Sequence, residues 1–324
     1  MEFISTTQMN ITMTEQVIGL SKNQDFTVTG QGSLNGKLFD YGVLLDGHGT
    51  NTFINLMRQQ DWLSIMSQED PWYALYTILK TIRFQKIRGS FESSGSTLLM
   101  MRAFEDRIET ISVGDSQIVI FKNDEYVYGT TPHNRKNPLE VERLPNHPYY
   151  SYSKKSSNIP AIKSATSLRA ITSEYNYFVH TMLAMTQSIG HNDITGYEPE
   201  RKTIFFDAND KMDVIMGSDG LWEMILLDDG RHPISEEDMP DVLQDKQDLL
   251  TMNAAELVSK SEARWKKTDW KYYWSPTSLE KFIINGFDGS YDDISAIKWT
   301  RDVASVKPLS ENVSHEDSAV KGGK

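Results

Sequence analysis

The feature that most constrains the fold of this chain is a series of short apolar runs between residues 97 and 130. Each run is too short for a stable helix, and turn-forming pairs such as Glu105-Asp106 and Asn123-Asp124 separate them. This pattern predicts consecutive antiparallel strands. The four runs occupy residues 97–104, 108–113, 117–121 and 125–130.

Apolar side chains at helical spacing predict helices elsewhere in the chain. Strands in runs and helices in pairs indicate an α+β protein in which antiparallel sheets pack together under helices. We expect one folded domain over residues 1–300 and a polar, disordered tail over 301–324. Helices are predicted at 51–66, 72–88, 178–189 and 253–266, further strands at 36–45, 203–206, 212–217 and 294–299, and irregular chain at 134–165 and 228–250.

Composition excludes several classes of function. The 324 residues include no cysteine, which rules out disulfides, zinc–thiolate sites and cysteine nucleophiles. A net charge of −12 disfavours nucleic acid and anionic membrane as partners. No apolar run is long enough to span a bilayer, and no signal peptide is visible. We therefore expect a soluble, cytoplasmic protein, with the nucleus as the alternative location, and we expect a monomer.

Four aspartates share one sequence context, an apolar strand end that is often followed by glycine. Strand ends hold side chains rigidly, and glycine allows a sharp turn that can also present a carbonyl. Four carboxylates without cysteine suit hard cations such as Mg²⁺ or Mn²⁺, and two such ions can share a carboxylate and activate water. Each motif alone is more often a plain turn. The four residues are Asp25, Asp46, Asp219 and Asp292.

Three further residues have competing interpretations. His48 lies between two glycines beside Asp46, where it could be a general acid or a surface histidine in a turn. His133 is weighted evenly between structure and function. Asp115 is interpreted as a turn former between two strands.

Taken in order, short motifs over residues 22–299 resemble the metal-dependent PPM family of protein phosphatases, also called type 2C. DGHG and GSDGLW in this order and spacing are the specific ones, and NPLEVER is an independent match. The matching segments are NQD (23–25), DGHG (46–49), SGSTL (94–98), VGDSQ (113–117), His133 to Arg143, MTQSIG (185–190), GSDGLW (217–222) and DDIS (292–295).

The resemblance implies two packed antiparallel sheets, each flanked by a pair of helices, and hydrolysis of phosphoserine and phosphothreonine by a water bound to two Mn²⁺ or Mg²⁺ ions. It implies that Asp46 bridges the two ions and that the Gly47 carbonyl binds the second. It assigns Asp219 and Asp292 to the first ion. Asp25 would act in or just outside this metal shell, and the partner would be a phosphorylated protein.

The resemblance also implies that His48 is the general acid, and Asp293 is excluded as a main ligand. Three family features are altered. The stretch from Gln187 to His191 stands in place of the family's Arg-x-x-Gly-Asp motif. Leu20 stands where an arginine commonly holds the substrate phosphate, and Lys22 could substitute as a weaker point charge. Pro132 stands where the resemblance implies a carboxylate for a third ion, so two ions are expected. The 144–186 region would form a flap beside the active site, although a solvated loop is slightly favoured over a docking surface.

Three functions remain open on the sequence. The first is a Mn²⁺/Mg²⁺-dependent serine/threonine phosphatase, which retention of all the paired-site aspartates favours. The second is a phosphatase-like binding or regulatory module with little activity. The third is a metal-dependent hydrolase of small phosphoesters.

Overall fold

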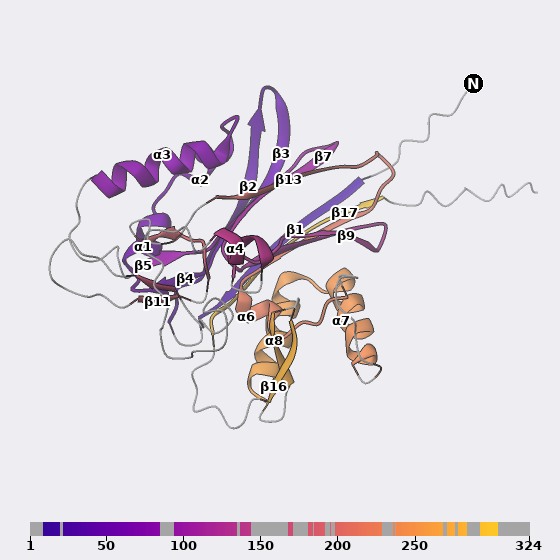
Figure 1. Ribbon diagram of the computed structural model, residues 1–324. Coiled ribbons are helices and arrows are strands. Elements are labelled where there is room, and N and C mark those ends of the chain that lie inside the picture. Colours follow the sequence, from indigo (N-terminus) through magenta and orange to yellow (C-terminus); the bar gives the residue numbers. More distant parts are fainter. Residues whose placement is uncertain are drawn as a thin grey trace, which may run out of the picture.

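Two five-stranded antiparallel sheets packed against each other form the centre of the protein, with helices outside them (Figure 1). The α+β expectation is confirmed. The computed structural model describes residues 9–19, 22–84, 94–134, 137–143, 168–170, 181–183, 185–191, 195, 198–228, 236, 238–267, 271–275, 278–283 and 292–303.

The first sheet brings together strands from both ends of the chain. In spatial order it comprises β1 (Met9–Ile18), β17 (Ile294–Val303), β14 (Met212–Gly217), β8 (Gln117–Lys122) and β9 (Glu125–Gly129). The second sheet comprises β13 (Glu200–Phe205), β7 (Arg107–Val113), β6 (Leu98–Ala103), β3 (Lys37–Leu45) and β2 (Phe26–Leu34).

Shorter elements complete the described structure. A three-stranded sheet contains β12 (Ile189–Gly190), β5 (Ser94–Ser96) and β4 (Gly47–Gly49), and two hairpins pair β10 (Leu168–Ala170) with β11 (Thr181–Leu183) and β15 (Lys271–Ser275) with β16 (Ser278–Ile283). The helices are α1 (Thr52–Met57), α2 (Trp62–Met66), α3 (Pro71–Phe84), α4 (Pro138–Arg143), α6 (Asp219–Trp222), α7 (Met239–Thr251) and α8 (Ala254–Trp265).

The central strands are buried on both faces. In β6, Leu98 and Met100 pack in the cluster under α1–α3, whereas Leu99 and Met101 pack between the sheets. Successive strand residues point to opposite faces, so a continuous apolar run is what a strand covered on both sides requires. A separate apolar cluster lies under α6 and α8.

Four sequence-based predictions of structure were wrong. The 134–165 stretch, expected to be irregular, contains α4. The 51–66 helix is two helices, because Asp61 caps a new one by accepting a hydrogen bond from the Ser64 amide at 3.0 Å. The 178–189 segment contains β11 and the start of β12 instead of a helix. The 228–250 loop contains α7, whose buried face carries aspartates and so hid its amphipathic pattern. β17 begins at Ile294 as predicted and continues to Val303, beyond the predicted strand end at 299.

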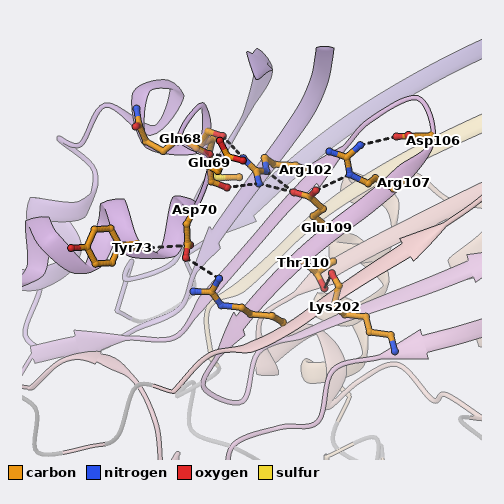
Figure 2. A network of polar contacts seen from close by, with 12 residues as sticks. Gln68, Glu69, Asp70, Tyr73, Arg102, Asp106, Arg107, Glu109, Thr110 and Lys202 are labelled. Atoms are coloured by element: carbon orange, nitrogen blue, oxygen red, sulfur yellow. Dashed lines mark hydrogen bonds and ion pairs between the residues drawn. The ribbon is translucent and has the colours of Figure 1, made fainter. Parts of the chain in front are cut away.

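A buried arginine anchors the helices on the second sheet. The Arg102 guanidinium donates to the carbonyls of Met66 at 3.2 Å and Gln68 at 2.7 Å, in the segment that joins α2 to α3. It also pairs with Glu109 on β7 at 2.6 Å (Figure 2). Asp70 at the start of α3 binds Arg201 of β13 at 3.0 Å. Together these contacts orient α3 against the sheet.

A second buried charge network holds the helices on the first sheet. Asp245 of α7 is fully buried and accepts hydrogen bonds from both Arg264 nitrogens, at 2.7 and 2.8 Å, and from the Lys260 ammonium. It also accepts from the Leu226 amide at 2.7 Å. One carboxylate therefore joins α7, α8 and the segment that follows α6.

Among the described residues, no helix is long and apolar enough to cross a membrane.

We expect Asp245→Asn to lower the free energy of unfolding by about 3–5 kcal/mol, because removing one partner of a buried ion pair leaves the others uncompensated. Urea denaturation followed by circular dichroism measures the change. Asp241→Asn, at an exposed position near the start of the same helix, is the control and should shift stability by about 1 kcal/mol or less. Equal losses in the two variants would contradict this role for Asp245.

Candidate metal-dependent active site

Strand pairing brings the predicted aspartates to one end of the sandwich. Phe26, the first residue of β2, pairs with Leu45, the last residue of β3. Asp25 and Asp46 adjoin these residues and therefore lie at the same end of the sheet. Gly217 pairs with Ala296, which places Asp219 after β14 and Asp292 before β17 at the corresponding edge of the other sheet. The site is therefore built from both sheets.

Two glycines permit the close approach of the turns. A Cβ atom on Gly47 would lie 2.6 Å from the Gln24 carbonyl oxygen, and one on Gly220 would lie 2.2 Å from the Asp293 carbonyl oxygen. Neither contact is possible for a larger residue without a shift of the backbone. These glycines therefore hold the Asp46 turn against the Asp25 turn, and α6 against the start of β17.

Thr97 fixes the Asp46 turn by two hydrogen bonds. Its amide donates to the Asp46 carbonyl at 2.9 Å, and its hydroxyl oxygen accepts from the Asp46 amide at 3.2 Å. The same hydroxyl lies 2.7 Å from the Ser116 hydroxyl. Thr97 thus links the turn of Asp46 with the turn that carries Asp115.

The electrostatics show a buried cluster of like charges. Burial raises the pKa of Asp46 well above its ordinary value, and the neighbouring charges of Asp219, Asp25, Asp292 and Asp115 raise it further. Burial, followed by the charges of Asp292 and Asp115, raises the pKa of Asp219 well above its ordinary value. Burial is also the main cause that raises the pKa of Asp25 to about 7. Such a cluster requires positive charge if it is to stay ionised.

The donor atoms fit a hard divalent cation. Both carboxyl oxygens of Asp25 and one oxygen each of Asp115 and Asp219 are buried without a hydrogen-bond partner among the described residues. Unpartnered carboxylate oxygens are the ligands that Mg²⁺ and Mn²⁺ prefer. Within the same part of the chain, no three acidic or histidine side chains are arranged to enclose a single ion as they stand. The carboxylates must therefore turn toward a cation to bind it.

Lys22 lies at the rim of the cluster. Its ammonium nitrogen is 3.7 Å from an Asp292 carboxyl oxygen, and its side chain is 56% exposed. Burial lowers the pKa of Lys22, but the charges of Asp292, Asp46 and Asp219 outweigh burial and raise the pKa overall. Leu20, the other position considered for phosphate binding, lies outside the described residues, as does most of the 144–186 region.

His48 lies beside a second histidine. Its ring centroid is 5.0 Å from that of His191, in an edge-on arrangement, and both of its ring nitrogens are buried. Burial, the neighbouring His191 and the charge of Lys22 lower the pKa of His48 to about 3. The imidazole is therefore neutral near pH 7, and it can offer one N–H group but not the second proton of an imidazolium.

Asp293 has a structural role. One of its carboxyl oxygens accepts from the Gln24 amide at 2.7 Å, and the other from the Lys22 amide at 3.4 Å. It thereby ties the segment before Asp25 to the start of β17.

The structure adds two carboxylates that sequence analysis did not assign to the site. Asp115 does lie in a turn, but it is also a buried member of the acidic cluster, and burial and the charge of Asp292 raise its pKa to about 6. Burial and the charges of Asp219, Asp292 and Asp115 raise the pKa of Glu223. The signals were present, since Asp115 follows an apolar strand like the others and Glu223 is one helical turn beyond Asp219.

The comparisons with known proteins agree with this geometry. A family model described as protein phosphatase 2C matches residues 46–232, more than half of the chain. The chain belongs to the protein phosphatase 2C family. Protein phosphatase 1B of Homo sapiens is 25% identical over 142 residues, which cover 44% of this chain and 27% of the human protein. For the Rattus norvegicus protein the identity is also 25%, over 44% of this chain and 33% of the relative. The match thus spans about a third or less of these relatives.

Two solved structures share the fold of this chain. The S. agalactiae serine/threonine phosphatase has a TM-score of 0.50 at 18% identity, and the match covers 92% of this chain and 100% of that one. A C. elegans sex determining protein has a TM-score of 0.57 at 14% identity, over 90% of this chain and 64% of that one. At these identities the likeness shows the fold alone. The predicted fold and family are confirmed.

We expect Mn²⁺ binding to release protons at pH 6 and to weaken as the pH falls from 8 to 6. Asp25 and Asp115, with pKa values of about 7 and 6, hold protons in this range that a cation must displace. Calorimetric titration at pH 6 and pH 8, in buffers of different ionisation enthalpy, counts the protons. Asp25→Asn should release fewer protons at pH 6. Equal release at both pH values would contradict this expectation.

Proposed function

We propose that this chain is a metal-dependent protein serine/threonine phosphatase. The observation that carries the proposal is the convergence of buried carboxylates from both sheets at one end of the sandwich, in a member of the protein phosphatase 2C family. Two Mn²⁺ or Mg²⁺ ions bound there would supply a water of lowered pKa and a positive field for the phosphoryl oxygens. The substrate is a phosphoserine or phosphothreonine of another protein.

The residues of the chain divide the work as follows. Asp46, in the middle of the cluster, would be shared by the two ions, and the Gly47 carbonyl would bind the second. Asp219 and Asp292 would hold the first ion. Asp25 would act in or just outside this metal shell and add negative charge. All five residues lie in turns or segments next to paired strand ends, which hold them in place.

Two side chains act on the substrate rather than on the metal. Lys22 is half-exposed at the rim of the cluster, where its ammonium can attract the phosphate dianion. His48 is the candidate donor to the departing alkoxide. Because its pKa is lowered to about 3, it would act through the N–H of a neutral imidazole, which is a weaker acid than an imidazolium.

An assay with and without Mn²⁺ tests the proposal. Turnover of both an aryl phosphate and a phosphothreonine peptide, dependent on Mn²⁺, is the expected result. Turnover of the aryl phosphate alone would support a small-phosphoester hydrolase. No Mn²⁺-dependent turnover of either compound would support a phosphatase-like binding module and overturn the proposal.

We expect Asp46→Asn and Asp219→Asn each to lower kcat at least about a hundredfold, because loss of a ligand charge weakens metal binding and leaves less metal-bound hydroxide near neutral pH. Steady-state kinetics at saturating Mn²⁺ measures the effect. Asp207→Asn is the matched control, since Asp207 is exposed in the turn before β14, at the opposite end of the sandwich. Turnover near the wild-type value in Asp46→Asn or Asp219→Asn would rule out this metal centre.

We expect Lys22→Met to raise KM for a phosphopeptide up to about tenfold with kcat changed less than about threefold, and Lys22→Arg to retain the wild-type KM. A charge-assisted contact to phosphate is worth about 1.5–3 kcal/mol, and the exposure of Lys22 reduces this value. Lys37→Met, at the far end of β3, is the control. If Lys22→Met instead tightens Mn²⁺ binding and leaves KM unchanged, Lys22 only neutralises Asp292.

A further inference from the structure

The turn that carries Asp115 includes a glycine, Gly114, in a backbone conformation that other residues rarely adopt. Gly114 has a φ of +107°, and a Cβ atom at this position would lie 2.7 Å from the Thr97 side chain. Asp115 follows at once, with one buried carboxyl oxygen that has no hydrogen-bond partner among the described residues. The position of that carboxylate thus depends on what holds the backbone of Gly114.

His133 binds both backbone polar groups of Gly114. The Gly114 amide donates to His133 Nδ1 at 3.0 Å, and the His133 amide donates to the Gly114 carbonyl at 2.8 Å. His133 is 6% exposed, and burial lowers its pKa. The ring is therefore neutral near pH 7, with Nδ1 as an acceptor and the proton on Nε2.

His133 is itself held by the segment before β12. The Thr186 amide donates to the His133 carbonyl at 2.8 Å. The Thr186 hydroxyl donates to Glu140 of α4, which also accepts from Gln187 Nε2 at 2.7 Å and pairs with Arg143 at 2.6 Å. Glu140 is 3% exposed. A buried hydrogen-bond network centred on Glu140 thus holds Thr186, which in turn binds the backbone of the histidine.

We propose that His133 is a positioning residue that sets the place of the Asp115 carboxylate within the acidic cluster. This inference rests on the proposed metal-dependent function, because the position of Asp115 matters only if the cluster binds a cation. His133 does not touch the reacting atoms. It acts through the Gly114 backbone, in the way that partners of metal ligands orient the ligands themselves.

The test compares Mn²⁺ binding by calorimetry in His133→Leu, which removes the acceptor, and His133→Asn, whose side-chain oxygen can replace Nδ1. We expect His133→Leu to weaken the Mn²⁺ site that Asp115→Asn also weakens, by about tenfold or more, and His133→Asn to recover to within about threefold of the wild type. In the double variant with Asp115→Asn, His133→Leu should cause no further loss, because both changes affect one group.

Thr130→Val is the matched control. Thr130 is equally buried and its hydroxyl oxygen accepts one backbone hydrogen bond, from the Ile118 amide at 2.9 Å on the neighbouring strand. Thr130→Val should lower the melting temperature as His133→Leu does, but it should leave the Mn²⁺ affinity unchanged. If His133→Leu does not fold, His133→Gln, whose polar group lies farther from the backbone, takes its place.

Two outcomes would overturn the inference. One is wild-type Mn²⁺ affinity in a folded variant that lacks the acceptor, and the other is a loss that adds in full to that of Asp115→Asn. Failure of the wild-type protein to bind Mn²⁺ is a different result, since it would overturn the proposed function and the inference with it.

Discussion

Repulsion among buried carboxylates is the constraint on which this structure depends. Asp25, Asp46, Asp115 and Asp219 lie together in a region that burial has largely removed from water. The charges of Asp25, Asp115 and Asp292 raise the free energy of charging both Asp46 and Asp219. Only a stiff framework can hold such groups together. The apolar layer between the sheets, which includes Leu44 and Met216, supplies the framework because close-packed interiors resist small displacements.

Hydrogen bonds from neutral side chains to the backbone position the turns of Asp46 and Asp115. Thr97 binds the backbone of Asp46 on one side and the hydroxyl of Ser116 on the other. His133 binds the backbone of Gly114. Such contacts leave the carboxylate oxygens themselves available, whereas an arginine partner would occupy them. The full ion-pair networks, around Asp245 and Arg102, attach the outer helices instead.

The predictions from sequence succeeded where local pattern and tertiary burial agree. The strands between residues 97 and 130 were recognised because turn-forming pairs separate short apolar runs, and β6 and β8 are buried on both faces. The 228–250 stretch was misread because α7 buries Asp245 against cations of α8, and an acid at a buried position breaks the apolar pattern. Asp115 was likewise taken for a turn former, since nothing local distinguishes a buried turn aspartate from an exposed one.

The sequence by itself determined the class of fold, the family resemblance and the identity of the main acidic residues, because strand length, glycine turns and short motifs are local properties. Only the tertiary structure decided which carboxylates lie close enough to raise one another's pKa values. Asp115 and Asp292 lie far apart in the sequence. The charge of Asp292 nevertheless raises the pKa of Asp115, because β8 and β17, which follow these residues, flank the same strand, β14. It also decided that His48 is neutral and that His133 binds Gly114. Burial and through-space contacts set these properties, and neither is a function of neighbouring letters in the chain.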